Sequence, residues 1–291
     1  KPGTDGKLYC IDPSSGRQFW TKALGDRLTG SPAVIGLDVF IATDAGMIYT
    51  LDIASGARLG ETKLSGPVYG SVATDGKSLF MISAAGFLHS IRVSGPEAWR
   101  LPVAPNTDAT PAVDGGVVYM ADQKGTARAV QADDGKVLWT SELGSEFCRC
   151  PVVLPEMVVF GCSDGRLTAL NRRTGESVWQ TQLQTRFLRY EPVPLLFKSP
   201  EPPHPLPDRD VQVDGVLGED TSPVLLCMSE GRPVLIDPAN GQPTGAQLVT
   251  GSVQRDGKFK PDGGPPGIGE LTAPISYYKG YLAFVPIEGD I

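Results

Sequence analysis

The sequence lacks any run of about 18 apolar residues, the length that a membrane-spanning helix requires. It also lacks a clustered excess of Lys and Arg, and its net charge of -7 argues against a nucleic-acid-binding surface. The two histidines, His89 and His204, have no partner at the spacing of metal ligands. No Gly-x-Ser-x-Gly elbow, phosphate-binding loop or dinucleotide fingerprint occurs. We therefore expect no membrane span and no nucleic-acid partner, and the sequence offers no known catalytic motif.

Cysteine is too scarce for a disulfide scaffold, since the chain has five: Cys10, Cys148, Cys150, Cys162 and Cys227. Cys148 and Cys150 flank a single residue, without a two-residue spacer or a second such pair, which disfavours a zinc site. A disulfide from Cys162 to Cys148 or Cys150 and a set of buried free thiols are both compatible with this pattern. Cysteine content therefore leaves the redox compartment open.

What the chain does contain is a repeat. Turn glycines recur at Gly6, Gly46, Gly86, Gly125, Gly165, Gly231 and Gly289, so the first four spacings are 40, 40, 39 and 40 residues and the last two are 66 and 58. Apolar residues alternate with polar ones between the turns, and 35 glycines and 26 prolines suit many short strands. A period near 40 with four strands per unit predicts an all-β propeller of four-stranded antiparallel blades, in a single domain over residues 1–291.

The two ends of the chain look like complementary halves of one blade. The chain starts with the outer strands of a blade and ends with two strands, 273–278 and 281–286, that resemble the inner ones. Pairing them would close six repeats into a ring and remove two exposed sheet edges. The alternative is a fragment of a propeller with seven or eight blades.

All four tryptophans stand four residues after a turn glycine. A large ring at the same point of each blade can pack on the neighbouring blade while its N–H finds an acceptor. We therefore assign structural repeat roles to Trp20, Trp99, Trp139, Trp179, Gly16, Gly95, Gly135 and Gly175. Gly60 and Gly245 replace the tryptophan in the second and sixth repeats, so these two junctions should pack differently.

The segments at 5–20, 124–139 and 164–179, with the strand openings Ser31-Pro32, Thr110-Pro111 and Ser222-Pro223, resemble the PQQ-like repeat family. This family comprises β-propellers related to pyrroloquinoline-quinone (PQQ) dehydrogenases and to BamB-type outer-membrane assembly lipoproteins. The resemblance spans nearly the whole chain and implies the fold, but not an activity, because the fold hosts both enzymes and scaffolds.

A quinoprotein dehydrogenase of this family would need a calcium site, a catalytic Asp and a clamped PQQ. The family's adjacent cysteine pair has no counterpart, because Arg149 separates Cys148 from Cys150. The residues Asp12, Asp52, Asn171 and Asp237 recur at one repeat position, so we interpret them as turn caps rather than as metal ligands. We predict no cofactor and no catalytic, cofactor-binding or metal-binding residues, with PQQ and Ca²⁺ as the alternative.

Two segments interrupt the period: 198–221, between strands expected at 191–197 and 224–228, and 250–270. The first opens with a Pro-rich stretch, which is extended and unsuited to a packed strand. Because strands alternate direction, we expect these two loops to leave opposite faces of the propeller and to carry partner binding, with tolerated insertions as the alternative. Beside the first interruption, Arg186, Phe187, Arg189 and Tyr190 combine residue types favoured at interfaces. Their alternative role is an ordinary connection between blades.

These observations favour a non-catalytic scaffold that binds protein or peptide partners in a larger assembly, in the periplasm or outside the cell. The alternative is a PQQ-dependent oxidoreductase or a degenerate relative of one. The chain opens at Lys1 inside a repeat and has no signal-peptide pattern there. We therefore also consider a sensor or extracellular domain that belongs to a longer chain.

Overall fold

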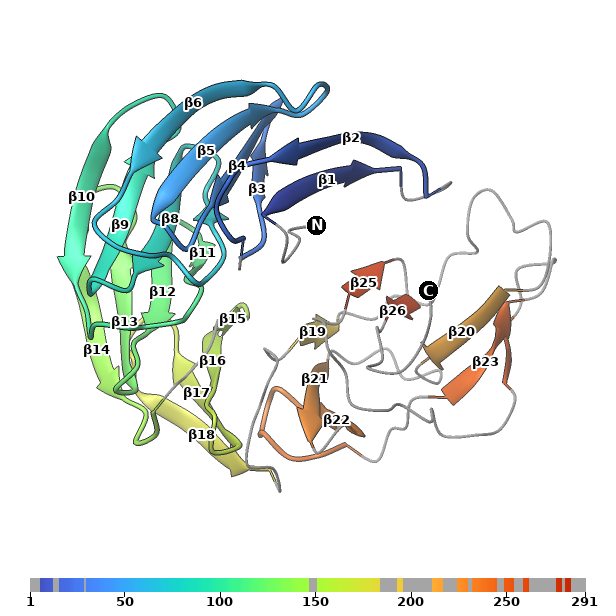
Figure 1. Ribbon diagram of the computed structural model, residues 1–291. Helices are drawn as coiled ribbons and strands as arrows, with labels where there is room; N and C mark the ends of the chain where they lie inside the picture. Colours follow the sequence, from blue (N-terminus) through green and yellow to red (C-terminus); the bar gives the residue numbers. More distant parts are fainter. Residues whose placement is uncertain are drawn as a thin grey trace. The chain divides into compact units, whose positions relative to one another are not determined.

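The computed structural model (Figure 1) is built from β-strands, and the described residues contain no α-helix. It describes residues 6–12, 16–28, 30–146, 151–183, 193–195, 211–216, 224–229, 232–244, 249–253, 259–261, 276–278 and 281–283. The chain forms two compact units, residues 1–162 with 170–178 and residues 163–169 with 179–291. Because the boundary falls inside two strands of one sheet, the single-domain prediction stays a prediction.

The first unit contains a two-stranded sheet and three complete four-stranded sheets, all antiparallel. The first sheet pairs β1 (Lys7–Ile11) with β2 (Gln18–Ala23). The second contains β3 (Ala33–Ile35), β4 (Asp38–Ala42), β5 (Met47–Asp52) and β6 (Arg58–Lys63). The third contains β7 (Ala73–Thr74), β8 (Ser78–Ser83), β9 (Phe87–Arg92) and β10 (Glu97–Pro102). The fourth contains β11 (Ala112–Asp114), β12 (Val117–Ala121), β13 (Thr126–Gln131) and β14 (Val137–Glu142).

A further four-stranded sheet follows the same order. Its strands are β15 (Val152–Val153), β16 (Met157–Gly161), β17 (Arg166–Asn171) and β18 (Ser177–Gln182). In every complete sheet the strand at the tryptophan position comes last, and the first strands β3 and β11 follow Ser31-Pro32 and Thr110-Pro111. The predicted blade, running from the Pro strand to the Trp strand, is confirmed.

The sequence pattern of each strand matches its place in the sheet. The second strands, such as β8 and β12, are almost entirely buried because both faces of the sheet are covered, and they are rich in Val, Ile, Phe and Met. The outermost strands are largely exposed. Buried apolar clusters join consecutive sheets of the first unit, for example Phe80, Ile82 and Leu88 with Val118 and Met120. The core of this unit is therefore a series of layers between neighbouring sheets.

A β-bulge interrupts the last strand pair of the four sheets of the first unit. Cys10 pairs with Trp20 and Ile11 with Gln18, which leaves Phe19 as the extra residue. The extra residues of the following sheets are Leu59, Ala98 and Leu138. Phe19 is 55% exposed and Leu59 58%, so the bulge turns the side chain before the tryptophan position into solvent.

The second unit contains three small sheets. One has the order β19 (Val193–Leu195), β21 (Val224–Ser229), β22 (Arg232–Ile236), and another has the order β20 (Val211–Val216), β23 (Val249–Val253), β24 (Phe259–Pro261). The last pairs β25 (Ser276–Tyr278) with β26 (Tyr281–Ala283). The strands predicted on either side of the first interruption are thus present as β19 and β21.

The expectation that both interruptions are loops is wrong, because each contributes residues to strands of one sheet. That they leave opposite faces of the propeller stays a prediction. β20 lies inside 198–221 and pairs antiparallel with β23, where Val211 is opposite Val253. The Pro-rich opening led to the expectation of a loop, but β20 (VQVDGV) and β23 (VTGSV) have the β-branched alternation of strands. Closure of a six-bladed ring by the two ends stays a prediction, as does the alternative of a larger propeller.

Candidate functional site

The four tryptophans make the same contact at four junctions between repeats. Each indole N–H donates a hydrogen bond to a main-chain carbonyl of the next repeat. This carbonyl lies three residues before the turn glycine that contacts the ring: Gly56, Gly135, Gly175 or Gly241. The pairs are Trp20 with Ile53 (2.9 Å), Trp99 with Ala132 (2.9 Å), Trp139 with Arg172 (3.0 Å) and Trp179 with Pro238 (2.9 Å). The contact satisfies the indole while burying its ring, so it joins neighbouring repeats.

A glycine lies against each of these indole rings. A Cβ on Gly175 would come within 2.7 Å of the Trp139 ring, and Gly135 stands in the same relation to Trp99. Both glycines have a left-handed backbone, with φ of 75°. Glycine is therefore required twice, by the backbone conformation and by the close approach of the ring. Gly16 shares the conformation (φ 69°), but a Cβ added there would have nothing within 4 Å. A Cβ added at Gly95 would meet only Arg92.

Three of the four residues at the recurring turn position, Asp52, Asn171 and Asp237, cap their own turns, as predicted. Oδ1 of Asp52 accepts hydrogen bonds from the Ser55 N–H (2.8 Å) and hydroxyl (2.5 Å). Asn171 accepts two main-chain bonds in the same way, and Asp237 accepts one from Ala239. The bonds from the Ser55 side chain and main chain lower the pKa of Asp52. These groups face their own loops and do not converge on a ligand.

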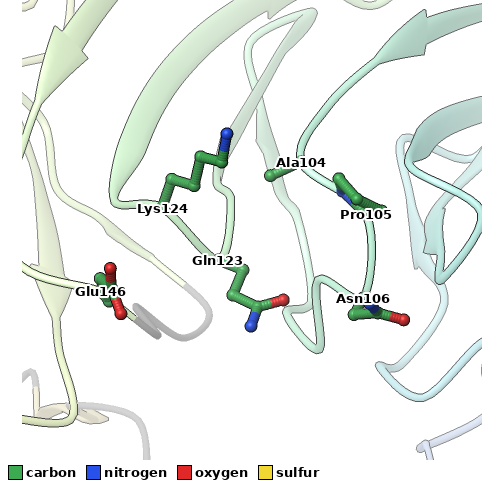
Figure 2. A pocket seen from close by; sticks show the side chains of 6 residues that line it. All are labelled: Ala104, Pro105, Asn106, Gln123, Lys124 and Glu146. Atoms are coloured by element: carbon green, nitrogen blue, oxygen red, sulfur yellow. The ribbon is translucent and has the colours of Figure 1, made fainter.

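An open cavity of about 320 Å³ lies at the connection between β10 and β11 and the turn between β12 and β13. It is lined by Ala104, Pro105, Asn106, Gln123, Lys124 and Glu146. Figure 2 shows Gln123 and Lys124 leaving the turn in opposite directions. With its amide nitrogen facing the connection, Gln123 donates to the carbonyls of Pro105 (2.9 Å) and Asn106 (3.0 Å). Asn106 has a left-handed backbone (φ 57°), so these bonds hold a strained connection in place.

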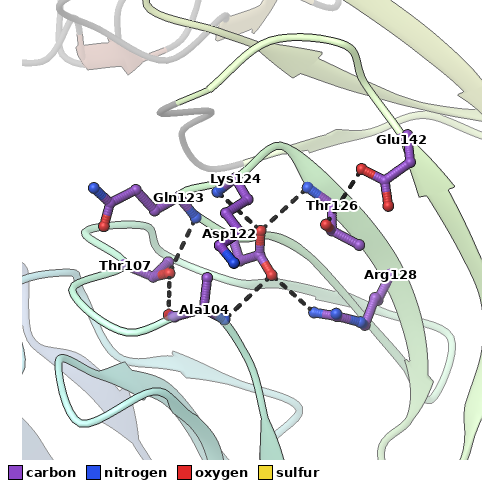
Figure 3. A network of polar contacts seen from close by, with 8 residues as sticks. All are labelled: Ala104, Thr107, Asp122, Gln123, Lys124, Thr126, Arg128 and Glu142. Atoms are coloured by element: carbon purple, nitrogen blue, oxygen red, sulfur yellow. Dashed lines mark hydrogen bonds and ion pairs between the residues drawn. The ribbon is translucent and has the colours of Figure 1, made fainter.

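Asp122 is the most completely bonded buried carboxylate among the described residues, with 2% of its surface exposed (Figure 3). Its Oδ1 accepts from the N–H groups of Lys124 and Thr126, both at 3.1 Å. Its Oδ2 accepts from the Ala104 N–H (3.3 Å) and from the Arg128 guanidinium (3.1 Å). Asp122 therefore ties the turn of one repeat to the connection that arrives from the repeat before it.

Asp122 lies three residues before Gly125, one of the glycines that mark the 40-residue period. The residues three positions before Gly46, Gly86 and Gly165 are of different types. Thr43 accepts a bond from the Met47 N–H (3.1 Å) and donates to Asp26 (3.4 Å), which lies in the connection between β2 and β3. Cys162 is fully buried and disulfide-bonded, and the predicted partners Cys148 and Cys150 lie outside the described residues. The position thus links each turn to its surroundings.

At the same position, Ser83 belongs to a hydrogen-bonded chain with His89 and Glu97. The distance from Ser83 Oγ to His89 Nε2 is 2.8 Å, and that from His89 Nδ1 to Glu97 Oε1 is 2.5 Å. This is the connectivity of a nucleophile–base–acid triad. Ser83 is 0% exposed, however, so a substrate cannot reach its hydroxyl. These three hydrogen-bonded side chains therefore cross-link β8, β9 and β10 rather than forming a catalytic centre.

The predicted interface residues Arg186, Phe187, Arg189 and Tyr190 lie outside the described residues, as does His204. Within the part of the chain that is described, no group of three or more His, Cys, Asp and Glu side chains could hold a metal ion. No helix there is long and apolar enough to cross a membrane. The absence of a cofactor stays a prediction.

Sequence reasoning missed the Asp122 network and the Ser83–His89–Glu97 chain. Both lie on positions three residues before and three residues after a turn glycine: Ser83 and His89 flank Gly86, and Asp122 and Arg128 flank Gly125. Aligning the repeats at these two positions would have shown polar pairs within buried strands. The bulges carry a weaker signal, an apolar residue immediately before the tryptophan.

The fold and its repeated junctions define a β-propeller of four-stranded blades. The family model described as "Outer membrane protein assembly factor BamB" matches residues 4–94 and 88–251. The chain therefore belongs to this family of PQQ-like repeat propellers.

Among curated proteins, BamB of Escherichia coli is 34% identical over an alignment of 83 residues, which covers 25% of this chain and 21% of that protein. BamB of Shewanella oneidensis is 34% identical over 67 residues, 23% and 17% of the two chains. The 1-butanol dehydrogenase (cytochrome c) of Thauera butanivorans is 39% identical over 85 residues, 25% and 12%. The match thus spans about a fifth of the length of the BamB relatives.

Among solved structures, BamB from Moraxella catarrhalis superposes with a TM-score of 0.66 at 19% identity, covering 97% of this chain and 80% of that one. The quinohemoprotein alcohol dehydrogenase ADHIIG from Pseudomonas putida HK5 gives 0.59 at 15% identity, covering 77% and 42%. At these identities the likeness shows the fold alone.

Proposed function

We propose that this chain is a non-catalytic propeller scaffold that binds protein partners in an assembly of the cell envelope. The single observation that carries the proposal is that both interruptions of the repeat contribute strands to one sheet, β20–β23–β24. The recurring polar residues of the complete repeats are bonded to their own turns and junctions, whereas these two segments stand outside the repeat.

The register of this sheet supports partner binding. Val211, Val253 and Phe259 occupy one row of paired positions, and Gln212, Ser252 and Lys260 occupy the next. Because neighbouring positions along a strand belong to opposite faces, the rows alternate between apolar and polar residue types. A sheet with two such different faces is suited to binding another protein along one of them.

The location proposed is the periplasm or the cell exterior. The disulfide bond of Cys162 supports it, since disulfides persist in oxidising compartments. The printed name of the BamB relatives places their role in outer membrane protein assembly. By this analogy we propose that the partner is a component of an envelope assembly machinery.

Site-specific photo-crosslinking in intact cells tests the proposal. A crosslinking residue is placed on β20 at Val211 or Gln212, one position for each row, and at Asp134, an exposed turn residue of a complete repeat, as the matched control. We expect one identified envelope protein to crosslink from β20 and not from Asp134. Equal products from all three positions, or none from β20, would contradict partner binding by this sheet.

A quinone-dependent oxidoreductase is the second candidate, favoured by the 39% identity to the Thauera butanivorans dehydrogenase. The fit is poor among the described residues, because the recurrent carboxylates Asp52 and Asp237 are engaged by their own turns. Saturable binding of pyrroloquinoline quinone with Ca²⁺, accompanied by dye-linked alcohol oxidation, would replace the scaffold proposal with this one.

A further inference from the structure

One junction of the first unit lacks its tryptophan but keeps the groups that receive an indole elsewhere. Gly60 on β6 stands where β2, β10, β14 and β18 carry Trp20, Trp99, Trp139 and Trp179. At those four junctions the ring lies against a glycine and its N–H bonds to a main-chain carbonyl of the following repeat. The question is what occupies this place between the second and third repeats.

The receiving side of the junction is open. Val93 is the counterpart of the acceptor residues Ile53 and Ala132. Its N–H donates to the Lys77 carbonyl, just as the N–H groups of those two residues donate to the carbonyls of Leu37 and Gly116. Among the described residues, no group donates a hydrogen bond to the Val93 carbonyl. Gly95 is exposed, whereas Gly56 and Gly175 are buried beneath their tryptophans. The carbonyl and the glycine therefore remain free to meet a ring.

On the opposite side of the junction, Gly60 has no side chain to cover Thr50. A Cβ on Gly60 would meet only Thr50, at 4.0 Å. In the third repeat, Trp99 pairs with Ser90 and Ser90 with Phe80, and the two rings are 5.9 Å apart. The second repeat preserves this row as Gly60, Thr50 and Phe40. The aromatic residue of this row is thus retained without the indole, and Phe40 is buried in an apolar cluster against which Val93 packs.

The turn at this junction has adapted to the missing ring. The Gly95 N–H bonds three residues back to Arg92, whereas the Gly56 N–H bonds four residues back to Asp52. Gly95 also lacks the left-handed conformation of Gly56. The turn is one residue shorter, which accounts for the spacing of 39 residues in place of 40. With no indole to cover it, the turn glycine needs neither the extra residue nor the positive φ.

We propose that this vacant indole position is a binding site for a tryptophan side chain of a partner protein. The ring would lie over Gly60 and Thr50, and its N–H would donate to the Val93 carbonyl. Tryptophan is favoured over phenylalanine because the site offers a main-chain acceptor. Leu59, 58% exposed at the adjacent bulge, and the Arg58–Glu61 ion pair (2.8 Å) lie next to Gly60 along β6 and give the site an apolar and polar rim. This site is separate from the β20–β23–β24 sheet.

The test is a titration of the whole protein with N-acetyl-tryptophanamide, followed by the NMR shifts of the Ser94 and Gly95 amides. We expect saturable shifts confined to this junction, and weaker binding of N-acetyl-phenylalaninamide. Gly60→Trp supplies the ring from within, and Gly95→Val blocks the slot from the exposed turn. Each variant should weaken binding at least tenfold. Trp139→Gly is the matched control, because it empties an equivalent position and should add a second site at Gly175.

Equal binding to the wild type and to a folded Gly60→Trp or Gly95→Val variant would overturn the proposal. So would the absence of saturable shifts at Ser94 and Gly95. Equal affinities for the tryptophan and phenylalanine amides would refute the hydrogen bond to Val93. Gly95→Val keeps the test decisive if Gly60→Trp does not fold, since it changes an exposed glycine with only Arg92 nearby.

Discussion

The contact between Trp139 and Gly175 gives a quantitative prediction about how repeats are joined. Gly175→Ala introduces two costs: a left-handed alanine at φ 75°, and a Cβ 2.7 Å from the Trp139 ring. The first costs about 1–2 kcal/mol and the second about 1–3 kcal/mol. We therefore expect Gly175→Ala to lower the free energy of unfolding by about 2–5 kcal/mol.

Gly16→Ala is the matched control, because Gly16 has a similar φ of 69° and nothing within 4 Å. It should show the conformational cost alone, about 1–2 kcal/mol. Trp139→Ala should cost about 3–5 kcal/mol, since it removes a buried ring and leaves a space. In the Trp139→Ala protein, the free-energy cost of Gly175→Ala should drop to that of Gly16→Ala. The difference gives a coupling of about 1–3 kcal/mol between positions 139 and 175.

Denaturant unfolding of the four variants, followed by circular dichroism, measures these differences. The reasoning is refuted if Gly16→Ala and Gly175→Ala cost the same, or if the costs of Trp139→Ala and Gly175→Ala simply add. Either outcome would mean that the ring and the turn glycine are independent, and that the junctions are held by other contacts.

Three further predictions concern single polar groups. Asp122→Asn should lower the free energy of unfolding by about 1.5–3 kcal/mol, since it removes the charge that pairs with Arg128. Thermal unfolding checks this against Thr107→Ser, which keeps the hydroxyl that accepts from the Gln123 N–H (3.1 Å). Without reductant, the unfolded protein should expose at most three of its five thiols to a thiol reagent, and reduction should lower Tm, because Cys162 is disulfide-bonded. Asp52 should titrate below the usual aspartate range and Ser55→Ala should raise its pKa, as read by NMR. Because the folded pKa is the lower one, the stabilisation from Asp52 is present above the unfolded pKa and lost as pH falls through the folded value; an unchanged pKa in Ser55→Ala would contradict this.

Much of the fold follows from the sequence because the same pattern of turns and strands recurs in successive repeats. The turn glycines fix the period, alternation marks the strands, and Trp139 and its sister residues mark the outer strands. What the sequence could not supply is the partner of each ring. The carbonyl that accepts from Trp139 belongs to Arg172, whose side chain has no part in that bond. A main-chain acceptor carries no signature in residue identity.

The interruptions show where local patterns fall short. A Pro-rich opening predicted a loop over 198–221, yet β20 within it pairs with β23, more than thirty residues further along. Pairing over such a separation depends on register and not on local composition. The buried ties were also missed, because Ser83 and Asp122 look like ordinary turn residues until the strands bring His89 and Ala104 beside them.

Proteins built from similar strands risk pairing one copy's strand with another's, because any outermost strand offers a template for the next. The extra residue in the outer strands of the first unit limits this risk. Phe19, Leu59 and Leu138 put the backbone out of step just before the tryptophan position, so an added strand would lose its ladder at that point. The same irregularity that turns the preceding side chain into solvent thus also favours the single chain over its own aggregates.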